Sequence, residues 1–189
     1  MSEGTLFTVG HSNRTAGEFL ELLAAHGIQT LVDVRRFPGS RRHPQFGQDA
    51  LAGALGAREI EYLHEADLGG RRASSAGGRV PSPNGAWRVA AFRAYADYAL
   101  TAPFRAALEL VLAHAAQRPT AVMCAEAVPW RCHRRIIADH AVARGWAVQH
   151  ILAPHRLESH DLHPEARVRE DGRVVYPAPD PEQAELWTR

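Results

Sequence analysis

The chain has 189 residues, of which 46% are hydrophobic and 23% are charged. This composition is typical of a globular protein of one domain and excludes a disordered, collagen-like or coiled-coil chain. The formal net charge is only +1, and arginine supplies every basic side chain other than histidine, so the overall charge argues against a general nucleic-acid coat protein.

Short apolar runs alternate with helical patterns along most of the chain. β-Strands are predicted at residues 5–9, 30–34, 61–64, 120–124 and 147–152. Helices are predicted at residues 16–26, 49–57, 89–100, 103–117 and from about 131 to 144. The first helix begins with the signature of a capping box, in which Thr15 is the cap and Glu18 follows three residues later.

Alternating strands and helices predict one α/β domain over residues 1–153. We expect a three-layer domain with a mostly parallel five-stranded sheet and helices on both faces, Rossmann-like or flavodoxin-like, with the strand order left open. Residues 73–87 are rich in Ser, Gly and Pro and predict a loop or lid. Residues 154–189 are predicted as a C-terminal extension or tail, with a small hairpin turning at Asp171 and Gly172.

Polar residues follow the predicted strands rather than precede them. After the first four strands come His11, Ser12 and Asn13, then Asp33 and Arg35, then Gly69, Gly70 and Arg71, and finally Glu126 and the segment around Cys132. The loops before the second and fourth strands are plain by comparison. Because ligands of parallel sheets bind beyond the carboxyl ends of the strands, this asymmetry predicts one site at that edge.

Several segments resemble the domain of unknown function 488 family. They are TVGHSNR at 8–14, LVDVRRFPGSRRHPQF at 31–46, LGGRR at 68–72, FRAYADYA at 92–99 and MCAEAVPWRCHRRIIAD at 123–139. The most specific signature is the cysteine segment that ends in Cys-His-Arg, which corresponds here to Cys124, Cys132, His133 and Arg134. The resemblance implies a shared fold and site over residues 5–153, and it implies no particular reaction.

The two cysteines are the candidate nucleophiles of this site. We expect Cys132 in the first turn of a helix among Arg131, His133 and Arg134, a positive setting that lowers the pKa of a thiol. Cys124 ends a strand and is either a small buried apolar side chain or a thiolate at the sheet edge.

Three kinds of residue could move protons or hold charge beside the cysteines. Glu126 and Asp33 are candidate acids or bases, or else they form ion pairs with arginines that hold the loops. His133 and His11 are candidate proton carriers near neutral pH.

Cys124, Cys132 and His133 could also supply three zinc ligands. Seven residues followed by an adjacent pair is not a usual zinc spacing, so no metal or other cofactor is expected.

The remaining candidates point to an anionic ligand. Arginine grips phosphate or carboxylate at two points, and several arginines would converge in a parallel sheet. Trp130 is a candidate for stacking on a base, or it simply packs. The predicted substrate-binding residues are His11, Ser12, Asn13, Arg35, Gly69, Gly70, Arg71, Trp130, Arg131 and Arg134.

These features favour a cysteine-dependent transferase or hydrolase that acts on a nucleotide or nucleic acid. The alternative is a non-catalytic nucleotide or nucleic-acid binding module in DNA maintenance. Gln183, Leu186 and Trp187 resemble a short peptide that docks on the replication sliding clamp. A cytoplasmic protein with no membrane contact is expected, because Met1–Gly4 lacks a signal-peptide pattern, no long apolar run occurs and two cysteines are too few for a disulfide scaffold.

Overall fold

The computed structural model describes residues 3–39, 41–72 and 81–179. The strands of its main sheet are β1 (Thr5–Gly10), β2 (Thr30–Asp33), β3 (Glu61–His64), β4 (Thr120–Cys124), β5 (Ala147–Ala153) and β6 (Arg156–Ser159). They lie in the order β3-β2-β4-β1-β5-β6, with the first five parallel and β6 antiparallel to β5. The five predicted strands are confirmed. The pattern does not predict β6 because all four of its residues are exposed, which leaves no apolar alternation to detect.

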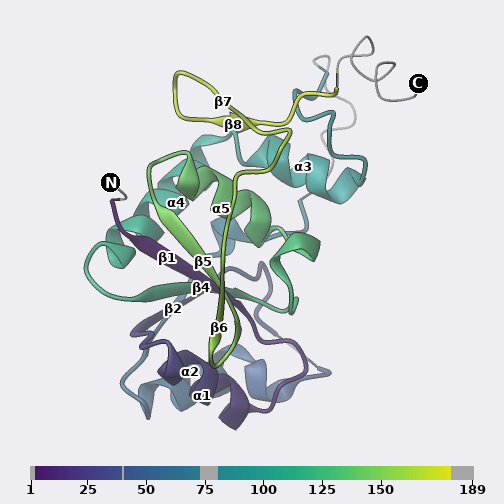
Figure 1. Cartoon of the computed structure of the whole chain (residues 1–189). Helices are drawn as coiled ribbons and strands as arrows, with labels where there is room; N and C mark the ends of the chain where they lie inside the picture. Colours follow the sequence, from purple (N-terminus) through teal and green to yellow (C-terminus); the bar gives the residue numbers. More distant parts are fainter. Residues whose placement is uncertain (1–2, 40, 73–80, 180–189) are drawn as a thin grey trace.

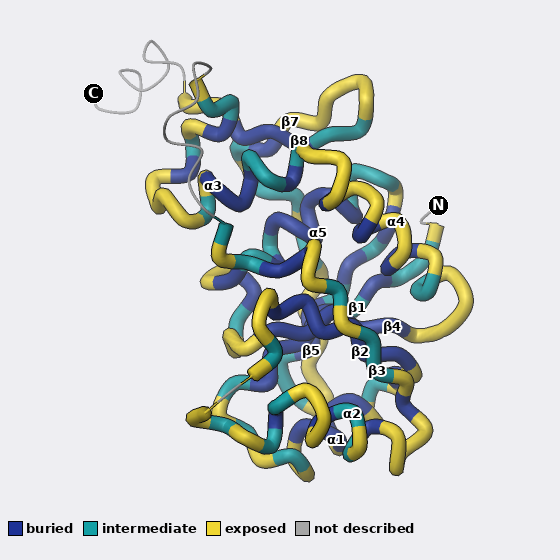
Figure 2. The backbone as a smooth tube through the Cα atoms, turned by 180° about the vertical axis from the view of Figure 1, so that it is seen from behind, coloured by how far each residue is buried: buried dark blue, intermediate teal, exposed yellow. Residues whose placement is uncertain are grey.

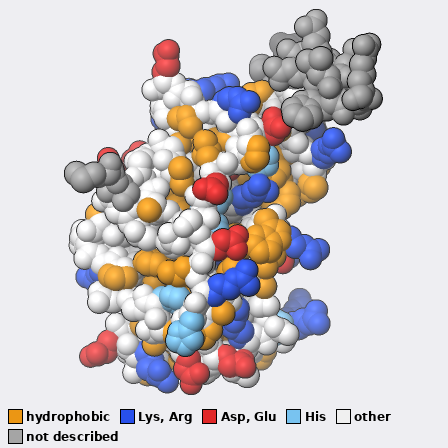
Figure 3. Space-filling view, in the orientation of Figure 1, with side chains coloured by type: hydrophobic (Ala, Val, Ile, Leu, Met, Phe, Trp, Pro, Cys, Tyr) orange, Lys and Arg blue, Asp and Glu red, His pale blue; other side chains and the backbone are white. Residues whose placement is uncertain are grey.

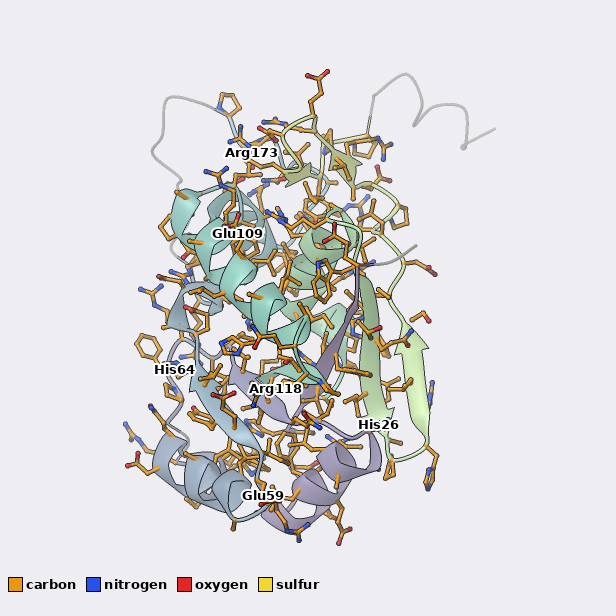
Figure 4. The ribbon with its side chains drawn as sticks, turned by 90° about the vertical axis from the view of Figure 1, so that its left-hand side faces the viewer. His26, Glu59, His64, Glu109, Arg118 and Arg173 are labelled. Carbon is orange, nitrogen blue, oxygen red and sulfur yellow. The ribbon has the colours of Figure 1, made fainter. Side chains whose placement is uncertain are left out.

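The helices cover both faces of the sheet, so the predicted three-layer α/β class is confirmed (Figure 1). On one face lie α1 (Ala16–Ala25) and α2 (Gln48–Gly56), and on the other lie α3 (Ala90–Tyr98), α4 (Ala102–Ala115) and α5 (Arg134–Val142). In the side-on view of Figure 4, Glu109 of α4 and Glu59, which follows α2, lie on opposite sides of the sheet. The two apolar layers enclose the central strands, which are among the buried dark segments of Figure 2.

The strand order opens a crevice at the end of β4. This strand lies between β1 and β2, so the order differs from both the Rossmann and the flavodoxin arrangements. The chain leaves β1 and β2 toward the α1–α2 layer, but it leaves β4 toward α5 in the other layer. Neighbouring parallel strands whose connections depart to opposite faces bind ligands beyond their carboxyl ends. Cys124, the last residue of β4, therefore lies at the topological switch point.

A local signal sets the start of α1, whereas the start of α5 differs from the sequence prediction. The capping box of α1 is confirmed, since the Glu18 backbone N–H donates to Thr15 Oγ1 and the Thr15 backbone N–H donates to the Glu18 carboxylate. The prediction that Cys132 lies in the first turn of a helix is wrong. Pro129 instead starts the separate 3₁₀ turn η3 (Pro129–Arg131), Cys132 has extended backbone at φ −138° and ψ 151°, and α5 begins at Arg134.

Two further 3₁₀ turns shape the loops that follow β2 and β3. They are η1 (Pro44–Phe46) and η2 (Ala66–Leu68), and each buries one side chain, Phe46 and Leu68 respectively. Arg72 fixes the loop after β3, because its guanidinium donates to the backbone carbonyls of Gly69, Ala66 and Asp67.

The C-terminal extension folds onto the domain as far as it is described. The predicted hairpin is confirmed as β7 (Arg167–Val168) paired with β8 (Val174–Val175), with Gly172 at φ +74° in its turn. Tyr176 follows it and is fully buried, with its hydroxyl donating to Asp139 Oδ2 at 2.6 Å. Most of the predicted lid (residues 73–80) and the docking residues Gln183, Leu186 and Trp187 lie outside the described residues.

Among the helices that the structure describes, we find none with the length and apolar character needed to cross a membrane.

Candidate functional site

A cavity of about 540 Å³ lies beyond the carboxyl ends of the parallel strands. Its wall comes from the loops after β1, β2, β3 and β4, from the end of β4 and from α3. We call it the site cavity. Among the predicted site residues, those that line it are His11, Arg35, Gly70, Arg71, Cys124, Glu126, Arg131, Cys132 and His133. Four stretches of chain that are distant in sequence thus meet in one place, as the polar residues after the strands predict.

The other predicted residues do not line the site cavity. Ser12 and Asn13 bond to each other through their side chains beside it, and Trp130 is exposed elsewhere on η3. Gly69, Asp33 and Arg134 are buried beneath the wall. A Cβ on Gly69 would lie 2.7 Å from the backbone of Arg36, so this glycine allows two loops to pack closely rather than contacting a ligand.

The centre of the site is the thiol pair, Cys124 and Cys132. Their sulfurs lie 2.8 Å apart, within hydrogen-bonding distance, and both residues are buried. Burial raises the pKa of Cys124 well above its usual value, and the hydrogen bond with Cys132 adds to this effect. Burial also opposes ionisation of Cys132, but the hydrogen bond from Cys124, the neighbouring His133 and the charge of Arg134 together lower its pKa well below the usual value. The two pKa values move in opposite directions, so Cys132 is the thiol of the pair that ionises more readily.

Nitrogen donors surround both sulfurs. The backbone N–H of Glu126 and Nε of Arg134 donate to Cys124 Sγ at 3.3 and 3.1 Å, and the backbone N–H of Arg134 donates to Cys132 Sγ at 3.5 Å. Such donors favour thiolate over thiol, because hydrogen bonds to the charged form stabilise it. The predicted substrate-binding role of Arg134 does not fit this geometry, since its guanidinium bonds to Cys124, the Glu126 carbonyl and Thr8 Oγ1.

The imidazole of His133 completes the cluster. Its Nδ1 lies 3.5 Å from Cys132 Sγ and its Nε2 lies 3.2 Å from the carbonyl oxygen of Val34. A carbonyl only accepts, so Nε2 carries a proton and donates it, and Nδ1 faces the sulfur. Tyr95 packs edge-on against the ring at 5.1 Å, and a Cβ on Gly70 would lie 3.0 Å from Nδ1. The ring is therefore held in one orientation.

Asp33 and Arg35 form an ion pair that supports the wall. Arg35 donates from Nε and Nη2 to both carboxylate oxygens of the fully buried Asp33, and the Tyr62 hydroxyl donates to the same carboxylate. Arg35 Nη2 also donates to the Phe46 carbonyl. Of the two readings that the sequence left open for Asp33, this geometry favours the ion pair over proton transfer.

His11 is a neutral part of the wall. Burial, with the nearby charge of Arg35, lowers its pKa to about 4. Its ring stacks on Phe46 at 4.2 Å, and its Nε2 lies 3.4 Å from Arg35 Nη1. A group with this pKa carries no charge near pH 7, so His11 is a poor proton carrier there.

Three arginines border the site cavity with their side chains exposed, and we call Arg36, Arg71 and Arg131 the arginine rim. Within the described parts of the chain, none of them forms an ion pair. Elsewhere charges are mixed: Figure 3 shows arginines interspersed with carboxylates and hydrophobic side chains over one face. The rim is therefore a local positive feature of a molecule whose net charge is only +1.

Sequence reasoning missed several residues of the wall, including Arg36, Phe37, His43 and Tyr95. The first three belong to the arginine-rich loop after β2, where nothing in the sequence shows which members face inward. Tyr95 belongs to the segment FRAYADYA, and its hydroxyl donates to the Leu68 carbonyl at 2.6 Å. The available signal is that this segment is one of those that resemble the family.

Fold and site together define a three-layer α/β protein with a buried pair of cysteine thiols at the carboxyl edge of its sheet. The chain belongs to the family described as "Domain of unknown function DUF488", whose model matches residues 15–141. No curated protein and no solved structure matches the chain. The matched region contains both cysteines, His133 and Arg134, and the chemistry has to be argued from these residues themselves.

Proposed function

We propose that this protein is a cysteine-dependent transferase or hydrolase that acts on an anionic substrate, a nucleotide or a nucleic acid. The observation that carries the proposal is that the thiol pair and the arginine rim share the wall of one cavity. Its volume of about 540 Å³ lies within the range of small-molecule sites.

Cys132 is the better nucleophile of the two. Donors from Cys124 and the Arg134 backbone stabilise its thiolate, and His133 Nδ1 is placed to take up its proton. Nucleophilic catalysis combines a thiol, a neighbouring base and a third group that orients the base. Here the third group is the Val34 carbonyl, because it accepts the hydrogen bond from His133 Nε2 and so orients the ring.

The reaction takes two steps. In the first, the Cys132 sulfur bonds to the electrophilic atom of the substrate, and the leaving group departs with the electron pair of the broken bond. The imidazolium of His133, or the carboxyl group of Glu126, gives the leaving group its proton. In the second step, water or an acceptor hydroxyl attacks the same atom and gives up a proton to that base. The sulfur leaves as a thiolate, which restores the site.

Two features of the wall favour a nucleotide or nucleic acid. The arginine rim supplies charge-assisted donors for phosphate oxygens. Phe37 lies on the same wall with 64% of its surface exposed, which leaves a ring face for a base to stack on. We also place the protein in the reducing cytoplasm, a compartment in which cysteines that are in contact stay reduced.

The alternative is a non-catalytic nucleotide or nucleic-acid binding module in DNA maintenance. The observation that favours it is thiol burial: Cys124 and Cys132 are only 2% and 4% exposed, and buried cysteines are usually inert. In that case the arginine rim binds the ligand while the cysteines pack. Docking on a sliding clamp through Gln183, Leu186 and Trp187 stays a prediction, which loss of clamp binding on deletion of residues 183–189 would support.

Calorimetry of the reduced, chelator-treated chain tests the proposal. The ligands titrated are phosphate, a nucleoside monophosphate, a nucleoside triphosphate and a short oligonucleotide. We expect at least one to bind, and Arg71→Gln and Arg131→Gln each to weaken it roughly tenfold, the worth of about one charge-assisted hydrogen bond. Arg58→Gln, outside the site cavity, is the matched control and should bind like the wild type.

Mass spectrometry of the same mixtures separates enzyme from binding module. Product formation, or a substrate adduct on Cys132 that Cys132→Ser abolishes, supports the enzyme. Binding without product or adduct contradicts it and leaves the binding module. If no anion binds, or if the rim variants bind as tightly as the wild type, both functions are wrong.

A further inference from the structure

We propose that Cys124, Cys132 and His133 bind one thiophilic divalent cation of the Zn²⁺ class, with an open coordination position that faces the site cavity. The proposal concerns metal binding, so it goes beyond the catalytic role of Cys132 and is tested separately from it. The three residues are the one such cluster of possible ligands in the described part of the chain.

The ligand atoms are almost in place. All three lie within 4.8 Å of one another. The 3.5 Å between Cys132 Sγ and His133 Nδ1 is close to the separation of about 3.6 Å expected between sulfur and nitrogen on a tetrahedral zinc ion. The two sulfurs are 2.8 Å apart and must separate to about 3.8 Å. Cys132 lies between η3 and α5, outside regular structure, where a side-chain shift of about 1 Å (the difference required by that geometry) is feasible.

The charge of the cluster leaves room for a cation. Three N–H groups donate to the two sulfurs, an environment suited to thiolates. Two thiolates in contact repel each other, and the buried Arg134 guanidinium compensates only one of them. A divalent ion balances the other, and any proton that the sulfurs still carry is released as the ion binds.

His133 has the support expected of a metal ligand. Metal-binding histidines commonly donate their second ring N–H to a carbonyl or carboxylate, which fixes the tautomer and aims the other nitrogen at the ion. Here Nε2 donates to the Val34 carbonyl and Nδ1 faces the sulfurs. Arg134 is itself anchored through Thr8 Oγ1, which bonds to His150 Nδ1 at 2.7 Å. The ligands therefore rest on a hydrogen-bonded second layer.

Three protein ligands leave one position for water or a ligand, as in zinc sites that take part in chemistry. All three residues line the site cavity, so the open position faces the space bordered by the arginine rim. The two thiolates cancel the charge of the ion, and the charge of Arg134 remains. The loaded site would thus attract an anion, while neither sulfur is free to act as a nucleophile.

Cobalt(II) is the probe for this site, because thiolate ligands give it a charge-transfer absorption that nitrogen and oxygen ligands do not. The reduced full chain, freed of metal by a chelator, is titrated with Co²⁺ in the absence of substrate. We expect saturation at one ion per chain with thiolate charge transfer, and displacement by Zn²⁺. Cys124→Ser and Cys132→Ser should abolish the band, and His133→Gln should weaken binding at least tenfold.

His155→Gln is the matched control, because His155 is exposed in the turn between β5 and β6. It should bind Co²⁺ like the wild type, and circular dichroism shows whether each variant is folded. Absence of the charge-transfer band in the wild-type chain would overturn the proposal even if every variant fails to fold, and so would a band that persists in folded Cys132→Ser. Anion binding is measured with chelator present, so the two proposals can fail independently.

Discussion

His140 is a buried histidine that takes no part in the site cavity. It lies on α5 with no exposed surface, and neither ring nitrogen has a hydrogen-bond partner among the described residues. Its ring packs edge-on against Phe104 at 5.0 Å. Burial, with the charge of Arg144, lowers its pKa to about 3. The imidazole is therefore uncharged at neutral pH.

The substitution His140→Leu should therefore make the protein less sensitive to acid. The unfolded chain binds a proton at this histidine below a pKa of about 6.5, whereas the folded chain does not until pH falls to about 3. Stability is thus lost as pH falls through this window, by up to about 1.4 kcal/mol per pH unit for one such group.

Urea denaturation at pH 7 and at pH 5 measures this effect. Leucine is apolar and of similar volume, so we expect a change of less than about 1.5 kcal/mol at pH 7. Between the two pH values the variant should lose less stability than the wild type. An equal loss would show that His140 is protonated in the folded protein.

At the scale of elements, close backbone contact holds the loop after β4 against the end of β1. A Cβ on Gly10 would lie 1.8 Å from the carbonyl oxygen of Glu126, which is possible only for glycine. That same carbonyl accepts a hydrogen bond from Arg134 Nη2 at 2.5 Å. Gly10 therefore positions the arginine that supports Cys124.

We expect Gly10→Ala to destabilise the protein by about 1–3 kcal/mol, the usual cost of overpacking. Gly17→Ala in α1 is the matched control, because a Cβ there meets nothing within 4 Å, and it should be neutral or stabilising by up to about 1 kcal/mol. Thermal unfolding of the two variants is the measurement. Equal melting temperatures for both would mean that the loop does not rest on Gly10.

The elements also show what the sequence can and cannot predict. The capping box at Thr15, the five parallel strands and the polar groups after them depend on neighbours a few residues away, so they could be predicted. The insertion of β4 between β1 and β2 could not, because it depends on pairing between distant segments. The side chains of Thr8 and His150 form a hydrogen bond although they lie 142 positions apart, and no local pattern predicts such a contact.

The same limit applies to individual site residues. Arg134 and Arg35 both follow strands, which is why the sequence predicts that they bind substrate. In the structure Arg134 is buried beneath the thiol pair, and Arg35 is paired with Asp33. Their roles depend on which way a side chain turns once the backbone is placed. Composition and spacing cannot supply that information, whereas the edge of the sheet on which the site lies follows from topology alone.

At the scale of the whole molecule, a buried polar network joins the C-terminal extension to the domain. Asp139 is fully buried on α5 and accepts hydrogen bonds from the His163 backbone N–H and the Tyr176 hydroxyl, and one of its oxygens lies 2.9 Å from His160 Nε2. His160 in turn bonds to His150 on β5. The extension is therefore part of the folded body as far as Tyr176.

Tyr176→Phe should cost about 1–3 kcal/mol, because it leaves one oxygen of a buried carboxylate without that donor. Tyr98→Phe is the matched control, since among the described residues its hydroxyl makes only an exposed 3.4 Å bond, to Asp67, and its ring stays beneath Arg72. Denaturant unfolding gives the cost, and limited proteolysis should cut the extension faster in Tyr176→Phe alone. Identical behaviour of the two variants would mean that the extension is not held through Asp139.

The whole molecule is proposed to bring a reactive thiol and an anion-binding rim into one cavity, and two alkylating reagents test both properties at once. Iodoacetate and iodoacetamide deliver the same electrophilic carbon, but only iodoacetate is negatively charged. In the reduced, metal-free chain we expect both to modify Cys132 before Cys124. The preference is the rate with iodoacetate divided by the rate with iodoacetamide, compared with the same ratio for free cysteine. It should fall roughly tenfold in the double variant Arg71→Gln/Arg131→Gln, and it should also fall with added salt. A Cys132 that resists both reagents, or that shows the same preference as free cysteine with or without the two arginines, would contradict the proposed site.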